Sequence, residues 1–285
     1  MNGRKIHLVD TTLRDGSHAV RHSFTEDQVS DIAGALDECG VSIIEISHGD
    51  GLGGSSYTYG FSKVDELRLI RAASERVKNA RLAVLLLPGI GTIERLEEAR
   101  DCGANAVRVA THITEADVSA QHIAAAKKLG MFVTGFLMLA HMSEPGAIVE
   151  EALKMESYGA DYINLADSAG YLLPDEVSAR IEALAGRLEI PVGFHAHNNL
   201  SLAVANSLAA IESGAAYIDA TLCGLGAGAG NTQIEVLAGV LRRKGCDTGL
   251  DFYKLMDIAN NIMPSIMQRP QIIDTGSLML GYAGV

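Results

Sequence analysis

The chain has 285 residues, of which 48% are hydrophobic and 6 are proline, a composition typical of a globular protein with a substantial buried core. Its formal net charge of −12 argues against nucleic acids and acidic membrane surfaces as partners. The 4 cysteines are widely spaced and form no Cys-x-x-Cys pair, which argues against a disulfide framework and against a thiolate zinc site.

Short apolar runs recur along the chain, and each is followed by a polar or glycine-containing loop and a helical pattern. The expected strands cover 6–10, 42–48, 81–87, 106–112, 132–138, 162–167, 192–197 and 217–222. The expected helices cover 25–38, 62–77, 92–101, 115–129, 145–157, 175–186, 200–213 and 231–243. Glycines that close several helices indicate left-handed C-caps, at Gly40, Gly103, Gly130, Gly159 and Gly214.

Strand-like sequence begins by residue 6, which leaves no room for a signal peptide. The longest apolar stretch, LAVLLLPGI, is about half of the ~20 residues that a membrane span needs. We therefore expect a cytoplasmic protein.

Eight strand–helix units predict an α/β protein with a (β/α)8 TIM barrel, which takes about 250 residues. A doubly wound open sheet has the same alternation and is the alternative, because periodicity does not show whether the sheet closes. The count of eight favours the barrel. We expect a catalytic TIM-barrel domain over residues 1–250.

Polar residues gather at the expected C-terminal ends of the strands, where barrels build their active sites. Six of the 9 histidines fall there: His18, His48, His112, His141, His195 and His197. Asp15, Asp167 and Ser168 fall there as well, and Glu45, Asn164 and Asp219 interrupt strands that are otherwise apolar. This pattern indicates one polar mouth.

The segment HAHNN suggests a metal site. His195 and His197 are two positions apart on a strand and should point to the same side. A closed barrel would bring Asp15 close to them, although Asp15-Gly16 alone would indicate only a turn. Two imidazoles and a carboxylate leave open positions on an octahedral cation such as Mn²⁺, Co²⁺, Mg²⁺ or Fe²⁺. Structural zinc would require a closed set of four ligands.

Two residues beside Asp15 are candidates for chemistry. Arg14 could bind a substrate carboxylate or a developing enolate oxygen, and the alternative is a solvated surface arginine. His18 lies in the same loop, and histidine is the side chain best suited to act as a general base near neutral pH. The alternative for His18 is an ordinary loop residue. No lysine stands at a strand end to form a Schiff base.

The segment GLGAGA, residues 224–229, formally matches a dinucleotide-binding fingerprint. It follows the last strand and has no ribose-binding acidic residue about 20 positions later, so a dinucleotide site is not expected. We expect these glycines to let the backbone pass close to the metal pocket, with Asn231 capping the next helix.

Four segments in order, DTTLRDGSH, ADSAG, HAHNN and CGLGAGAGN, resemble the pyruvate aldolase branch of the metal-dependent aldolase and Claisen-condensing superfamily. The resemblance covers essentially the whole chain. It implies cleavage of 4-hydroxy-2-oxovalerate, or of a longer 4-hydroxy-2-oxo acid, to pyruvate and an aldehyde in aromatic or steroid catabolism. It further implies Asp15, His195 and His197 as ligands of Mn²⁺ (with Co²⁺ and Mg²⁺ as alternatives), His18 as the base, Arg14 as the transition-state stabiliser, and substrate contacts from Arg14, Ser168 and His195.

The resemblance also bears on the C-terminus. Family members continue beyond the position of Val285 with a tyrosine that contacts substrate and a helical region that helps to dock an acylating acetaldehyde or propionaldehyde dehydrogenase. We therefore expect residues 251–285 to be the start of a truncated C-terminal helical extension. Two alternatives remain: an acyl-CoA condensing or cleaving relative, similar to isopropylmalate synthase, and a weakly active partner subunit of the dehydrogenase. The short, glycine-rich second loop argues against the acyl-CoA relative.

Overall fold

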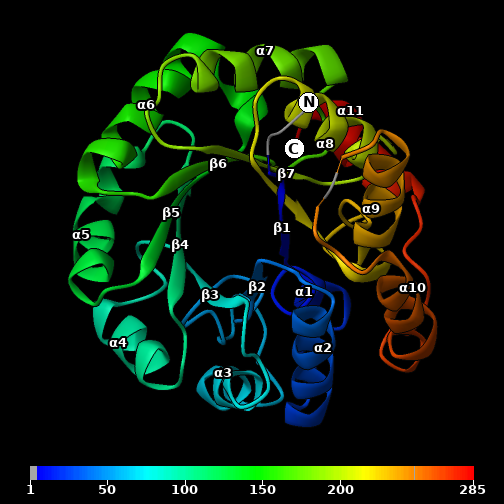
Figure 1. The fold of residues 1–285 in the computed structure, drawn as a ribbon. Coiled ribbons are helices and arrows are strands. Elements are labelled where there is room, and N and C mark those ends of the chain that lie inside the picture. The colour runs from blue at the N-terminus through cyan, green and yellow to red at the C-terminus, as the bar shows by residue number, and fades with distance from the viewer. Residues whose placement is uncertain (1–4, 247) are drawn as a thin grey trace.

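Eight parallel strands close into a barrel in the computed structural model, which describes residues 5–246 and 248–285 (Figure 1). The strands are β1 His7–Asp10, β2 Ile43–Glu45, β3 Arg81–Leu86, β4 Ala106–His112, β5 Phe132–Met138, β6 Tyr162–Asp167, β7 Val192–Ala196 and β8 Tyr217–Ala220. Each strand pairs with the next one along the chain, and β8 pairs with β1. This closure confirms the TIM barrel and excludes the open doubly wound sheet.

The eight expected helical patterns all form helices outside the barrel (Figure 1). They are α2 Glu26–Glu38, α3 Glu66–Ser74, α4 Ile93–Asp101, α5 Ala120–Lys128, α6 Pro145–Tyr158, α7 Pro174–Ala185, α8 Ala203–Glu212 and α9 Ile234–Arg243. Thr25 and Gln28 form a capping box that starts α2. The predicted C-cap glycines all have positive φ angles, from 74° at Gly130 to 127° at Gly214.

Several short helices were not predicted, because a single turn carries no hydrophobic period. They are α1 Gly16–Ala19 and the 3-10 helices η2 Ala140–Met142, η3 Leu222–Gly224 and η4 Met263–Ser265, whereas the 3-10 helix η1 Ala116–Ser119 falls inside the expected helix over 115–129. α1 positions the site, because it contains His18 and directly follows the loop after β1 that carries Arg14 and Asp15.

The inside of the barrel is built in layers. One apolar layer contains Val9, Ile43, Ala83, Ala106 and Tyr162, with Phe132 and Tyr217 packed against it. A second apolar layer contains Leu85, Ala110, Phe136 and Ala166. Side chains two positions apart on a strand face the same side, so Arg108 on β4 and Asn164 on β6 fall between the two layers. A polar layer is therefore enclosed between apolar ones.

The chain after α9 adds two helices. α10 Phe252–Asn261 buries Leu255 and Ile258 and packs beside α9. α11 Thr275–Ala283 returns to the mouth of the barrel, where Nε2 of His141 lies 2.9 Å from the carbonyl oxygen of Gly284. Residues 251–285 thus contain helices, whereas their separation from the barrel as a distinct domain stays a prediction. Of the helices described, none has the length and apolar character needed to cross a bilayer.

Candidate metal centre and active site

Three donor atoms converge at the C-terminal end of the barrel. Nε2 of His195 lies 3.3 Å from Nε2 of His197, so the two imidazoles do face the same side of β7. Oδ2 of Asp15, from the loop after β1, lies 3.4 Å from the first of these nitrogens and 3.8 Å from the second. His195 and Asp15 are almost fully buried.

The donor set fits a divalent cation. Two ligands at right angles, each about 2.1 Å from one ion, lie about 3 Å apart, close to the separations seen here. Nδ1 of His195 lies 2.9 Å from Oδ2 of Asp219, so this nitrogen donates its hydrogen to the carboxylate and Nε2 keeps its lone pair toward the other donors. A carboxylate behind a histidine is the usual support of a metal ligand.

The local charge balance also fits a cation. Three buried carboxyl groups, those of Asp15, Glu45 and Asp219, face only two buried guanidinium groups, those of Arg14 and Arg108. One negative charge therefore lacks a compensating guanidinium. Although each carboxylate has a partner, an excess of negative charge in a buried site is unfavourable, so a bound cation would stabilise this site.

The pKa shifts follow from burial and close pairing. Burial disfavours the charged form of Asp15, but Arg14, His197 and a hydrogen bond to His195 outweigh it and hold the pKa of Asp15 well below its ordinary range. Burial lowers the pKa of His197 to about 4, with a further contribution from neighbouring His195. Burial also opposes charge on His195, yet its hydrogen bonds to Asp15 and Asp219 raise its pKa. The site therefore offers an ionised carboxylate and a neutral imidazole at neutral pH.

A chain of alternating charges supports the donor set from below. Nε of Arg14 donates to Oε2 of Glu45 at 2.8 Å, and Nη1 of Arg108 donates to the same oxygen at 3.0 Å. Nη2 of Arg108 donates to Oδ2 of Asp219, which also binds His195. Arg108 thus links the partner of Arg14 to the partner of His195 in the polar layer of the barrel. Its guanidinium also lies 4.5 Å over the ring of Phe136.

All six residues predicted for the site line one cavity of about 220 Å³: Arg14, Asp15, His18, Ser168, His195 and His197. Leu85, Leu87, Phe136 and Met138 form an apolar part of its wall. Two nitrogens of the Arg14 guanidinium are engaged by Glu45 and Asp15, which leaves Nη2 for another acceptor. Oγ of Ser168 accepts a hydrogen bond from the backbone N–H of Leu139 at 3.1 Å, so its own O–H can donate.

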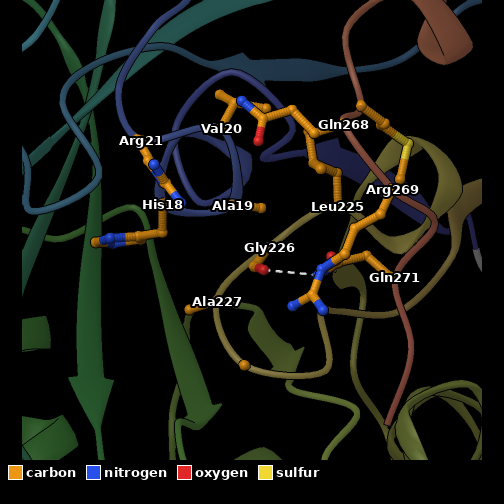
Figure 2. Close-up of a pocket in the computed structure, with 12 residues that line it drawn as sticks. His18, Ala19, Val20, Arg21, Leu225, Gly226, Ala227, Gln268, Arg269 and Gln271 are labelled. Carbon is orange, nitrogen blue, oxygen red and sulfur yellow. Dashed lines mark hydrogen bonds between the residues drawn. The ribbon is translucent and has the colours of Figure 1, made fainter. Parts of the chain in front are cut away.

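A larger cavity of about 590 Å³ adjoins this one, and Figure 2 shows the side chains around it. His18 and Ala227 line both cavities. Arg269 lies across the outer cavity from His18, and Nε2 of Gln271 donates to the carbonyl oxygen of Gly226 at 2.7 Å (Figure 2). The side chain of His18 therefore stands where the metal cavity opens toward the larger one.

The loop after β8 passes close to the donor set, as expected. The backbone N–H of Ala227 donates to Oδ1 of Asp15 at 3.0 Å, and a Cβ atom on Gly226 would lie 2.5 Å from Oδ1 of Asn231. The prediction that Asn231 caps the next helix is wrong, because α9 starts after Gln233 and has no side-chain cap. Both polar atoms of the buried Asn231 amide lack a hydrogen-bond partner among the described residues. A Cβ atom on Gly226 would lie 3.0 Å from Oδ1 of Asp15 as well, so this amide lies near the donor set.

Sequence reasoning missed the part played by Arg108, although an arginine in the apolar run AVRVATH was a usable signal. The polar residues Glu45, Asn164 and Asp219 were noticed in their strands, and all three face the inside of the barrel around Arg108. His112 and His141 lie at the mouth but contact Thr114 and Gly284 instead of the donor set.

Comparison with known proteins identifies the family. A family described as HMGL-like matches residues 5–262. The chain is 59% identical over 285 residues to a 4-hydroxy-2-oxovalerate aldolase of Moorella thermoacetica, covering 100% of this chain and 84% of that protein. It belongs to the HMGL-like family. Another relative, the 4-hydroxy-2-oxovalerate aldolase of Carboxydothermus hydrogenoformans, is 55% identical over 282 residues, covering 99% of this chain and 84% of that protein.

These HMGL-like relatives confirm the expected resemblance and the enzyme class, an aldolase. A solved structure of the carboxyl transferase domain of Rhizobium etli pyruvate carboxylase with 3-hydroxypyruvate superposes with a TM-score of 0.82. Its identity to this chain is 21%, over 95% of this chain and 48% of that one, so this likeness concerns the fold alone.

Proposed function

We propose that this chain cleaves 4-hydroxy-2-oxovalerate, or a longer 4-hydroxy-2-oxo acid, to pyruvate and an aldehyde. The observation that carries the proposal is one cavity that joins the donor set of Asp15, His195 and His197 to Arg14 and His18. The names of the relatives support the choice of substrate. We further propose that the donor set holds Mn²⁺, with Co²⁺ or Mg²⁺ as alternatives.

The residues of the cavity have separate tasks in this reaction. A bound divalent cation would supply Lewis-acid polarisation of the keto carbonyl. Ser168 donates its O–H to the substrate carboxylate. His18 accepts the proton of the C4 hydroxyl, directly or through a water molecule, as the C3–C4 bond breaks and the aldehyde leaves. Nη2 of Arg14 donates to the enolate oxygen as negative charge develops there, and protonation at C3 then gives pyruvate.

The test is pyruvate release from 4-hydroxy-2-oxovalerate with added Mn²⁺, with and without EDTA. We expect release that EDTA abolishes and fresh Mn²⁺ restores, while the His195→Ala/His197→Ala variant stays inactive under all three conditions. Absence of pyruvate with Mn²⁺, Co²⁺ and Mg²⁺ alike would contradict the proposal. Release of free CoA from acetyl-CoA and a 2-oxo acid would instead favour the acyl-CoA alternative.

We also propose that this reaction takes place in the cytoplasm, in the catabolism of aromatic compounds or steroids. We propose that an acylating acetaldehyde or propionaldehyde dehydrogenase is the partner of a chain that includes the further C-terminal region. The sequence resemblance alone supports this part. Co-purification of such a dehydrogenase with the chain, compared with and without that region, is the measurement that checks it.

A further inference from the structure

A second cluster of potential metal ligands lies beside the donor set of the barrel. One ring nitrogen each from His18 and His22 and one carboxylate oxygen of Asp50 lie within 4.8 Å of one another. The two histidines belong to the segment after β1, and Asp50 belongs to the loop after β2. No atom of this cluster belongs to Asp15, His195 or His197.

Packing holds the middle member of the cluster in place. His22 has a φ of 53°, its ring stacks on His48 with centroids 3.8 Å apart, and its Nδ1 lies 3.1 Å from Oγ of Ser17. His48 is itself fixed, because its Nε2 lies 3.1 Å from the carbonyl oxygen of Gly60. The imidazole of His22 therefore needs little ordering before it could bind an ion.

The charge state of the cluster also suits an ion. Burial, together with the neighbouring imidazoles of His48 and His18, lowers the pKa of His22 to about 4. His22 is therefore neutral at neutral pH, and an ion bound to its ring would replace one of the hydrogen bonds that the ring makes to Ser17 and to the backbone of Tyr59. Burial likewise lowers the pKa of His48, so this stacked neighbour adds no positive charge.

The third requirement is access from solvent. His18 and Asp50 are both partly exposed, and His18 lines the outer cavity (Figure 2). A Cβ atom on Gly49 would lie 2.6 Å from ring atoms of His18, so this ring rests directly on the backbone beside Asp50. Asp50 lines the inner cavity together with His18, so an ion that reaches either cavity meets at least one side chain of the cluster.

We propose that His18, His22 and Asp50 form a second, inhibitory site for a borderline divalent cation, and that Zn²⁺ is the ion suited to it. Two imidazoles and one carboxylate are a common three-residue zinc set, with a fourth position left for water. Affinity of such a site rises from Mn²⁺ to Zn²⁺, so Zn²⁺ would fill this cluster at concentrations at which Mn²⁺ leaves it empty. The inhibition rests on the proposed function, because it acts by removing the lone pair that His18 needs as a base.

The first experiment counts bound zinc by equilibrium dialysis and does not depend on activity. We expect two Zn²⁺ per chain in the wild type and in the control His112→Asn. We expect one in His22→Asn, and one in the His195→Ala/His197→Ala variant. Asparagine is chosen because it tolerates the positive φ of residue 22. Binding of only one zinc by the wild type, or of two by His22→Asn, overturns the proposal. If His22→Asn does not fold, Asp50→Asn takes its place in the experiment.

The second experiment titrates Zn²⁺ into the Mn²⁺-loaded chain during pyruvate release. We expect the wild type to lose activity, whereas His22→Asn keeps its activity and needs at least about tenfold more Zn²⁺ for the same loss. Equal sensitivity of both proteins would mean that Zn²⁺ displaces Mn²⁺ in the barrel, and this result overturns the inhibitory role. If neither protein releases pyruvate, the proposed function fails, while the zinc count still decides whether the second site exists.

Discussion

Arg14 is the residue whose geometry bears most directly on rate. Glu45 and Asp15 hold its planar group from two sides, which aims the remaining nitrogen at the cavity. Arg14→Lys keeps the positive charge but loses the planar guanidinium with its several N–H donors. We therefore expect a protein that folds and binds metal but has a turnover lowered by about 10²–10³. Metal analysis and steady-state kinetics check this. A lysine variant within about threefold of the wild type would exclude Arg14 from the transition state.

His18 should matter for bond cleavage more than for enolate chemistry. His18→Ala removes the base, while Arg14 and the donor set remain. We expect aldol cleavage to fall by about 10²–10⁴. Exchange of the pyruvate methyl protons with solvent, followed by NMR in D₂O, should persist. Equal loss of both reactions would show that His18 acts on pyruvate itself or on metal binding, contrary to its assigned task.

Arg108 should position the site without touching substrate. Arg108→Met leaves Asp219 buried without its guanidinium partner and Glu45 with Arg14 alone, which we expect to cost about 3–5 kcal/mol of folding stability. We also expect metal affinity to fall by about 10–100-fold, because Asp219 no longer orients His195. Metal titration and denaturant unfolding measure the two effects. The control is Arg81→Met, which removes a guanidinium that lies 4.6 Å over Phe132 in the other apolar layer. Unchanged affinity in Arg108→Met would contradict the positioning role.

The donor set could be predicted from the sequence because both of its signals are local. A His-x-His pair at a strand end fixes which way two imidazoles point, and closure of a barrel brings β1 near β7. The contacts of Arg108 could not be predicted, because its partners Glu45 and Asp219 lie 63 and 111 positions away. The wrong assignment of Asn231 has a similar cause: the turn that brings it near Asp15 depends on the packing of a glycine-rich loop whose sequence shows no hydrophobic periodicity.

At the scale of single elements, α2 is tied to the loop before β3 by one carboxylate. Asp37, in the last turn of α2, accepts hydrogen bonds from the backbone N–H groups of Lys78, Asn79 and Ala80. Burial alone would raise the pKa of Asp37, but these donors outweigh it and lower the pKa below its ordinary value of 3.8. The carboxylate therefore stabilises the fold at neutral pH.

We expect Asp37→Asn to cost about 1–3 kcal/mol of unfolding free energy at pH 7, because the amide accepts fewer of these bonds. Because the pKa of Asp37 is lowered in the folded state, its carboxylate stabilises the fold fully above about pH 4. This stabilisation is lost as the pH falls through the pKa of the folded state. Urea unfolding at several pH values should therefore show a difference between the two proteins that shrinks in acid. Asp31→Asn, at an exposed position of the same helix, is the control. A pH-independent difference would assign the effect to packing.

Elements were easier to predict than their ends. The expected strand over 42–48 is only Ile43–Glu45, because the chain leaves the sheet after Glu45 to begin the long loop toward α3. The expected helix over 115–129 is divided into η1 and α5. Hydrophobic periodicity reports which face is buried, whereas the end of an element depends on hydrogen bonds to neighbouring segments.

At the scale of the whole molecule, metal binding should stabilise the barrel, because ligands from the loop after β1 and from the end of β7 assemble only in the folded chain. At a Mn²⁺ concentration 100 times the dissociation constant, the expected gain is about 2.7 kcal/mol, seen as a rise of the melting temperature by a few degrees. EDTA should reverse the rise. The His195→Ala/His197→Ala variant should melt at the same temperature with and without Mn²⁺, and a rise in this variant would place the stabilising ion elsewhere.

The alternating charges inside the barrel restrict how this scaffold can be redesigned. Glu45, Arg108 and Asp219 come from three different strands but form one electrostatic unit. A library that varies them independently would consist mostly of chains with an uncompensated internal charge. Exchange of all three together for apolar residues of similar volume could keep the fold, because a buried ion network is often replaceable as a whole. This exchange would also remove the Asp219 carboxylate, which orients His195. Folding of the barrel can therefore be kept without its chemistry only if all three residues are exchanged together.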